Sequence, residues 1–166
     1  MASYRVVDNY LPQQQYLHLY KYMTGFLPDW KFIPYITHED DSADEGSQFC
    51  IPVQSDVSGI NDPHGYFAPL VSKINPVHMI RIKANCTLRT ENIIESKLHI
   101  DYEFPCMTSI YYINTCDGYT RFEDGSRIDS VGNRMLLFPS NMKHGGTTTT
   151  NQKYRMVINF NYHPRV

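Results

Sequence analysis

The residues that first suggest chemistry are His99 and Asp101, two positions apart in the stretch SKLHIDYEF. Side chains two residues apart on a β-strand point to the same face of the sheet, so an imidazole and a carboxylate would lie side by side. Such a pair is typical of metal ligands. The spacing alone is weak evidence, because a chain with seven histidines and eleven aspartates contains about half an HxD tripeptide by chance.

A second HxD tripeptide, at residues 38–40, lies in a different context. Residues 38–63 begin with five acidic side chains in eight positions and are rich in Asp, Ser, Gly and Pro. That composition predicts a long exposed loop, either a lid or a solvated connection. We interpret residues 38–40 as surface. The strand expected around His99 would instead turn Leu98 and Ile100 into the core and hold the polar pair rigidly.

A third ligand is available at His144, in the stretch FPSNMKHGGT. Two histidines and one aspartate form the facial triad that suits iron(II) and leaves coordination positions open. A zinc site of three histidines would not need the aspartate. The alternative is that His99 has no metal and hydrogen-bonds a neighbouring side chain at the mouth of a barrel.

Arg155 stands in KYRMVINFNY, where most other residues are apolar or aromatic. Strand alternation puts Arg155, Val157 and Asn159 on one face and the even-numbered residues on the other. An inward-facing arginine is unfavourable unless an anion neutralises it, and a guanidinium binds a carboxylate through two parallel hydrogen bonds. Arg155 is therefore either a clamp for a carboxylate ligand or half of a salt bridge within the protein.

The elements that must position these residues are mainly strands. Helices are expected at residues 12–24, which open with proline and close before Gly25, and at about 65–74. From residue 77 onward the strand-like stretches are HMIRIKANC, KLHIDYEF, CMTSIYYIN, GYTRFEDGSRIDS, NRMLLFPS and KYRMVINFNYH. Short strands joined by Asp-Gly turns predict a mostly β sandwich or jelly roll, with the N-terminal helices packed on one sheet.

Length and composition exclude several classes of function. The 166 residues are one domain's length, and we expect a single domain with an N-terminal support region at about 1–76 and a β core at about 77–163. A net charge of −2 gives no signal for nucleic acid or anionic membrane. The N-terminus lacks a signal pattern, so we expect a cytoplasmic protein whose four scattered cysteines are free thiols. Nothing indicates an oligomeric state.

The C-terminal half, from about Met79 to Tyr162, resembles the iron(II)- and 2-oxoglutarate-dependent oxygenases, within them the prolyl-4-hydroxylase-like branch. The resemblance rests on six ordered elements: HID, TSIYYIN, GYTRFEDG, RMLLFPS, HGGT and YRMVINFNY. The run is also similar to small phage-encoded oxygenases, which would place the protein in a host cytoplasm. Many family members have lysine where this chain has Arg155, but either cation pairs with a carboxylate.

The resemblance implies a double-stranded β-helix and assigns roles by position. The implied iron ligands are the two histidines and the aspartate already singled out: His99, Asp101 and His144. The implied 2-oxoglutarate contacts are a cation for the distal carboxylate, a tyrosine hydroxyl beside it, and two strand asparagines: Arg155, Tyr112, Asn85 and Asn159. No side chain is assigned as a general acid or base, because the chemistry of this family is centred on the metal.

The implied function is a dioxygenase, specifically a hydroxylase, that uses Fe(II), 2-oxoglutarate and O2 and couples substrate oxidation to decarboxylation of 2-oxoglutarate to succinate. The substrate is a peptide or small molecule, with peptidyl proline as one candidate. Two alternatives stay open: a non-catalytic jelly roll that binds a partner, and a cupin-like metalloprotein that does not use 2-oxoglutarate. Convergence of the three ligands argues against the first, and a buried Arg155 without a protein carboxylate argues against the second.

Overall fold

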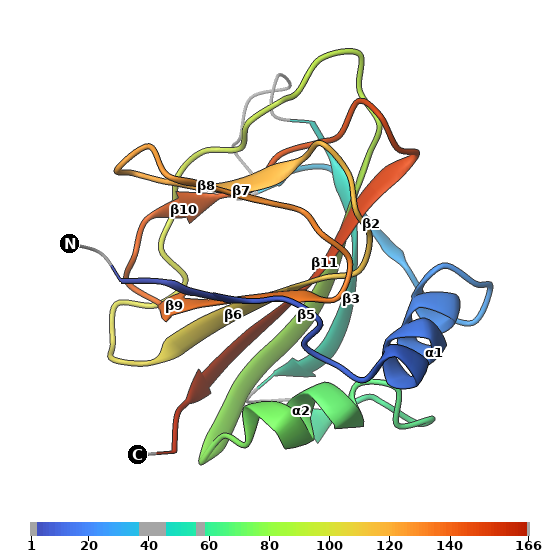
Figure 1. Ribbon diagram of the computed structural model, residues 1–166, viewed down its shortest axis with the longest axis vertical. Helices are drawn as coiled ribbons and strands as arrows, with labels where there is room; N and C mark the ends of the chain where they lie inside the picture. Colours follow the sequence, from blue (N-terminus) through green and yellow to red (C-terminus); the bar gives the residue numbers. More distant parts are fainter. Residues whose placement is uncertain (1–2, 37–45, 56–58, 166) are drawn as a thin grey trace.

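The computed structural model describes residues 3–36, 46–55 and 59–165, which form a strand-rich body with two helices (Figure 1). The elements follow one another along the described chain as β1 (Arg5–Val7), α1 (Gln13–Met23), β2 (Lys31–Ile33), β3 (Gln48–Ser55), β4 (Gly59–Ile60), α2 (Ala68–Ile74), β5 (His78–Leu88), β6 (Met107–Tyr112), β7 (Tyr119–Phe122), β8 (Arg127–Asp129), β9 (Arg134–Pro139), β10 (His144–Gly145) and β11 (Tyr154–His163).

Two β-sheets face each other (Figure 1). The larger sheet has the strand order β1-β9-β6-β11-β5-β3-β2, with β4 paired to β3, and the smaller sheet has the order β10-β7-β8. Every pair of named strands is antiparallel. This is the predicted jelly-roll architecture, and it places β11 between β5 and β6 in the middle of the larger sheet.

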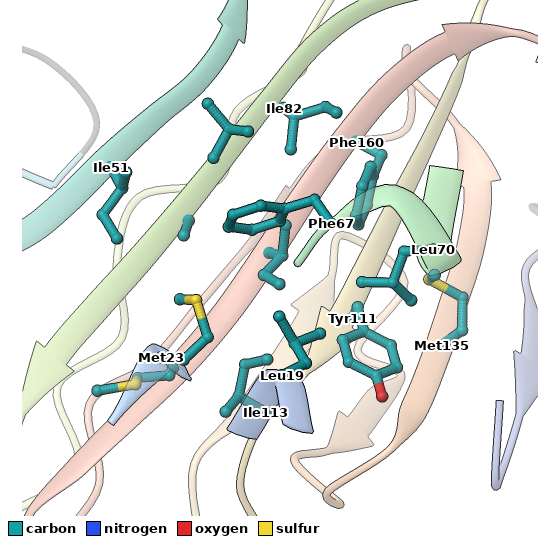
Figure 2. Close-up of a cluster of buried hydrophobic side chains, with 14 of the residues drawn as sticks. Leu19, Met23, Ile51, Phe67, Leu70, Ile82, Tyr111, Ile113, Met135 and Phe160 are labelled. Carbon is teal, nitrogen blue, oxygen red and sulfur yellow. The ribbon is translucent and has the colours of Figure 1, made fainter. Parts of the chain in front are cut away.

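Both helices pack on the outer face of the larger sheet, as predicted. The helix expected at 12–24 is α1, and the one expected at 65–74 begins later, at the first residue of α2. Leu19 of α1 and Leu70 of α2 lie in one apolar cluster with Phe160 of β11 (Figure 2). All three side chains are at most 2% exposed, so their packing holds the two helices against the outer face of the larger sheet.

The structure corrects the prediction that residues 38–63 form one long exposed loop. Strand β3 occupies part of that range and pairs with β2 on one side and β5 on the other. Pro52 obscured this strand in the sequence, because proline donates no ladder hydrogen bond and is expected only at edges or bulges. The register does shift between Pro52 and Gln54. The HxD copy at residues 38–40 and its acidic neighbours lie outside the described residues.

The inner faces of the two sheets meet in a second apolar cluster made by side chains from both: Ile110, Tyr112, Phe122, Ile128, Leu136, Phe138 and Val157. The alternation predicted for β11 is confirmed, because Met156 and Ile158 lie in the outer cluster and Val157 lies in the inner one. Tyr111 and Tyr112 divide in the same way. The inner face of β11, which carries Arg155, thus points between the sheets.

All four cysteines are buried free thiols, as predicted. Burial raises the pKa of Cys86 to about 12, so this thiol stays protonated and acts as apolar filler. None of the helices in the described chain has the length and apolarity needed to cross a membrane.

Candidate functional site

A cavity of about 300 Å³ opens between the two sheets, at the lower end of the usual size range of ligand sites. The inner faces of β5 and β11 form its floor, and the segments 94–101 and 144–148 form part of its wall. Its polar lining residues come from these segments, from β3 and from β7, and they include Gln48, Arg81, Lys83, Asn85, His99, Asp101, Thr120, His144, Arg155 and Asn159.

The segment that carries His99 and Asp101 is not the regular strand that was predicted. It is joined to the chain around His144 through isolated bridges. The backbone N–H groups of His99 and His144 each donate to the other residue's carbonyl oxygen, both at 2.9 Å. The expectation that Leu98 and Ile100 face the core is also wrong, because both are half-buried and Ile100 lines the cavity. This pair of backbone hydrogen bonds therefore holds the two histidines directly opposite each other.

The three predicted ligands converge. One potential ligand atom from each of His99, Asp101 and His144 lies within 4.8 Å of the others, and the two imidazole rings have centroids 4.6 Å apart. Nδ1 of His144 lies 3.0 Å from the carbonyl oxygen of Met142, which can only accept. Nδ1 of His99 lies 3.4 Å from the carbonyl oxygen of Lys97 in the same way. Both contacts favour the tautomer whose Nε2 lone pair is free to bind a metal.

The pKa values of Asp101 and His144 are both lowered, which favours an ionised carboxylate and a neutral imidazole, the forms that ligate metals. Burial alone would raise the pKa of Asp101, but it is lowered by His144, by Arg81 and by hydrogen bonds from the side chains of Asn161 and Thr108. Those two donors lie 2.8 Å from Oδ2, and Arg81 Nη2 lies 3.3 Å from Oδ1. Burial lowers the pKa of His144 and outweighs the opposing effect of Asp101.

Arg155 lies at the other end of the cavity and is only 5% exposed. Its guanidinium donates to neutral oxygens alone: Nε to Ser130 Oγ at 2.7 Å, Nη2 to Thr120 Oγ1 at 3.2 Å and Nη1 to the Thr147 carbonyl at 3.5 Å. Within the described ranges, no carboxylate pairs with it. Burial lowers its pKa, yet a guanidinium stays charged in proteins, so the cavity holds a buried cation without a protein counter-ion.

Gly118 allows the chain to approach Arg155 closely. A Cβ at this position would lie 2.5 Å from Cδ of Arg155 and 2.6 Å from the carbonyl oxygen of Thr148. We expect Gly118→Ala to displace the arginine and lower the free energy of unfolding by about 1–3 kcal/mol, measured by urea denaturation. Gly125→Ala is the control, because nothing lies within 4 Å of its added Cβ and only its positive φ of 85° is unfavourable. Wild-type stability in Gly118→Ala would contradict this close contact.

Of the three other residues predicted to bind the co-substrate, two line the cavity and one does not. Asn85 and Asn159 both line the cavity, and the Oδ1 atom of each is buried without a hydrogen-bond partner among the described residues. Tyr112 is fully buried behind the cavity wall and is absent from its lining. Its hydroxyl donates to Thr120 Oγ1 at 2.8 Å, and Thr120 Oγ1 also accepts from Arg155, so Tyr112 is linked to the cavity through these two residues.

Sequence reasoning missed several polar lining residues, and three of them are close to the predicted ones: Arg81, Lys83 and Thr120. Arg81 and Lys83 precede Asn85 at two-residue intervals on β5, so the alternation that placed Asn85 in the site also signalled these two cations. Thr120 contacts both Tyr112 and Arg155, and no sequence pattern distinguished it from other strand threonines.

No protein-family model matches the sequence, and no curated relative matches it. Solved structures match over nearly the whole chain. A 2OG-Fe(II) oxygenase-family oxidoreductase from Burkholderia pseudomallei superposes with a TM-score of 0.67 at 9% identity, covering 97% of this chain and 86% of its own. A prolyl-4-hydroxylase from Pseudomonas putida gives 0.62 at 12% identity, covering 99% of this chain and 94% of its own.

A viral collagen prolyl hydroxylase from Paramecium bursaria Chlorella virus-1, solved with 2-oxoglutarate, gives a TM-score of 0.57 at 10% identity. The match covers 98% of this chain and 96% of the viral enzyme. At such low identities these matches establish the fold. The chain therefore has the double-stranded β-helix fold of the 2-oxoglutarate- and Fe(II)-dependent oxygenases, as the sequence resemblance implied.

Proposed function

We propose that this chain, which has the fold of the 2OG-Fe(II) oxygenases, is an iron(II)- and 2-oxoglutarate-dependent dioxygenase that acts as a hydroxylase. One observation carries the proposal. A single cavity combines a two-histidine, one-aspartate cluster with a buried arginine that has no carboxylate partner in the described chain. A metal-free binding module does not account for the cluster, and a metalloprotein that does not use 2-oxoglutarate does not account for the arginine.

The residues fit an iron(II) ion. Two neutral imidazoles and one carboxylate are the donor set of the facial triad, which leaves coordination positions open for other ligands. His99, Asp101 and His144 would hold the ion. Asn161 and Thr108 would orient the carboxylate through the hydrogen bonds that they already donate to it.

The residues also fit 2-oxoglutarate. Its distal carboxylate would neutralise Arg155 through the paired hydrogen bonds that a guanidinium offers. Asn85 and Asn159 both line the cavity, and their side-chain NH2 groups would donate hydrogen bonds to the same molecule.

Bound iron and 2-oxoglutarate supply the oxidising chemistry, in which the co-substrate is decarboxylated to succinate and one oxygen atom enters the substrate. The protein's own contribution is positioning. Asp101 and the two histidines fix the metal end of the cavity, and Arg155 fixes the distal end. No side chain is required as a general acid or base.

Several finer points belong to the same proposal. We take the chain as one catalytic domain, with residues 1–76 supporting a β core at 77–163. We also propose a cytoplasmic location, or a host cytoplasm if a phage encodes the enzyme, which the free thiols support. Peptidyl proline remains a candidate substrate because prolyl hydroxylases are among the structures that share this fold.

The test is an anaerobic titration of metal-free protein with iron(II) and 2-oxoglutarate, following the visible charge-transfer band of the chelate. A saturable band, followed by succinate release when oxygen is admitted with a substrate, is the expected result. A folded wild-type protein that shows no band at any co-substrate concentration would refute the assignment.

The roles of Tyr112 and Thr120 can be separated by two nearly isosteric changes. Tyr112→Phe removes only the hydroxyl that donates to Thr120, whereas Thr120→Val removes the oxygen shared by Tyr112 and Arg155. A net hydrogen bond contributes about 0.5–1.5 kcal/mol, so we expect Tyr112→Phe to weaken 2-oxoglutarate binding by about 2- to 10-fold and Thr120→Val to weaken it more. The chelate band measures both. A larger effect of Tyr112→Phe would indicate that its hydroxyl contacts the co-substrate directly.

A further inference from the structure

Lys83 is a cation of the cavity that the proposed function does not use. It lies on the inner face of β5, half-buried, opposite Asn159 of β11 and Pro52 of β3. Pro52 has no side-chain acceptor for the Lys83 ammonium. Asn159 has one, Oδ1, but this atom has no hydrogen-bond partner among the described residues. Across residues 3–36, 46–55 and 59–165, no ion pair or hydrogen bond of the Lys83 ammonium is found.

Its neighbour on the same face, Arg81, is only partly neutralised. Its Nη2 contacts Asp101 Oδ1 at 3.3 Å, and its Nε donates to Asn161 Oδ1 at 2.9 Å. A guanidinium has five N–H donors, and the Arg81 side chain is 33% exposed, so further donors remain available to a ligand. Arg81 and Lys83, two residues apart on β5, therefore present two cationic groups to one cavity.

With iron(II) and 2-oxoglutarate bound, the cavity would contain more positive than negative charge. Of the described residues that line the cavity, three are basic, Arg81, Lys83 and Arg155, and Asp101 alone is acidic. The two positive charges of iron(II) and the one of Arg155 would be balanced by the two carboxylates of 2-oxoglutarate and by Asp101. Arg81 and Lys83 would then remain without compensation in a partly desolvated space, which is unfavourable unless another anion enters.

We propose that Lys83 and Arg81 form a subsite for an acidic group, a carboxylate or a phosphate, on the substrate that is oxidised. This inference rests on the proposed function and names the class of its substrate. The subsite adjoins the metal cluster, since Arg81 contacts the ligand Asp101 directly. An acidic substrate would therefore be bound with its charge close to the reacting centre, and neutral or cationic analogues would be rejected.

The experiment uses the anaerobic complex of the protein with iron(II) and 2-oxoglutarate. Three small probes are titrated into it by calorimetry at constant ionic strength: acetate, methylphosphonate and the uncharged acetamide. We expect at least one anion to bind and acetamide not to bind. Lys83→Met should lower the affinity for the bound anion at least tenfold, and Lys83→Arg should retain most of that affinity. The stronger of the two anions identifies the acidic group as a carboxylate or a phosphate.

Two controls make the result specific. Lys21→Met removes one positive charge from the exposed face of α1 and should leave anion binding unchanged. Thermal unfolding tests the fold of Lys83→Met, which should be at least as stable as the wild type because methionine replaces a cation with no protein partner in the described chain. Anion binding directly to iron would persist in Lys83→Met, so a loss there assigns the site to the lysine.

Three results would overturn the inference. The first is equal anion binding by wild type and Lys83→Met, and the second is the absence of any preference for the anions over acetamide. The third is a tenfold higher 2-oxoglutarate requirement for the chelate band in Lys83→Met, which would assign Lys83 to the co-substrate. A wild type without the band contradicts the proposed function instead. In that case the difference between wild type and Lys83→Met in anion binding by the metal-free protein decides this inference separately.

Discussion

Arg155→Met is expected to raise the 2-oxoglutarate concentration needed for half of the chelate band by about a hundredfold. Losing one partner of a buried, hydrogen-bonded charge pair costs roughly 2–5 kcal/mol, and each 1.4 kcal/mol corresponds to a factor of ten in affinity. The large effect follows from burial, because the guanidinium is 5% exposed and water cannot take over its role. Iron binding in the absence of 2-oxoglutarate should not change, since the metal cluster lies at the other end of the cavity.

The same variant should fold normally. Within the described chain Arg155 donates to hydroxyl and carbonyl oxygens and pairs with no carboxylate, so methionine leaves no buried anion behind. Arg127→Met is the matched control, because that arginine is exposed and pairs with Glu95 outside the cavity. If Arg155→Met binds 2-oxoglutarate as tightly as the Arg127 variant does, the clamp assigned to Arg155 is wrong.

The second large effect is expected for Asp101→Asn, which should abolish iron binding at concentrations that saturate the wild type. The amide has almost the same shape but carries no charge, and it replaces the one anionic ligand of the three. Equilibrium dialysis of iron(II) measures the loss without requiring turnover. Asp124→Asn is the control, because Asp124 lies in an exposed turn where it only accepts hydrogen bonds from Ser126.

The metal-free protein offers an independent measurement of the same residue. The pKa of Asp101 in the folded state lies below its usual value of 3.8, so its carboxylate stabilises the fold above that pH. This stabilisation is lost as the pH falls through the lowered pKa, and Asp101→Asn does not have it at any pH. The difference in unfolding free energy between the two proteins should therefore shrink in acid. A difference that is the same in acid as at neutral pH would contradict the lowered pKa of Asp101.

Strand alternation predicted much of the site from the sequence. It placed Arg155 and Asn159 on the inner face of β11. The reason is that a period of two residues fixes which face a side chain occupies, whatever the partner strand is. The same rule applied to β5 would have identified Arg81 and Lys83. The HxD spacing singled out His99 and Asp101, although the segment that carries them is not a regular strand.

Other features depended on tertiary contacts that no local pattern contains. Strand β3 was predicted as loop because residues 38–63 are rich in Asp, Ser, Gly and Pro, although β3 pairs with β5 even at Pro52. The segment at His99 was predicted as a regular strand, whereas only isolated bridges to the distant His144 form. The direction of the Tyr112 hydroxyl is set by Thr120, eight residues away, and could not be inferred from a resemblance.

The central place of β11 has a consequence for the order in which the protein can be assembled during its synthesis. Because β11 inserts between β5 and β6, those two strands cannot pair with each other and must wait for residues 154–163 to leave the ribosome. Until then the nascent chain exposes two long unpaired strand edges, which are sites of misassociation. A ribosome that stalls before Arg155 would release a chain that lacks both the central strand of the larger sheet and Arg155, so one segment completes the sheet and the cavity together.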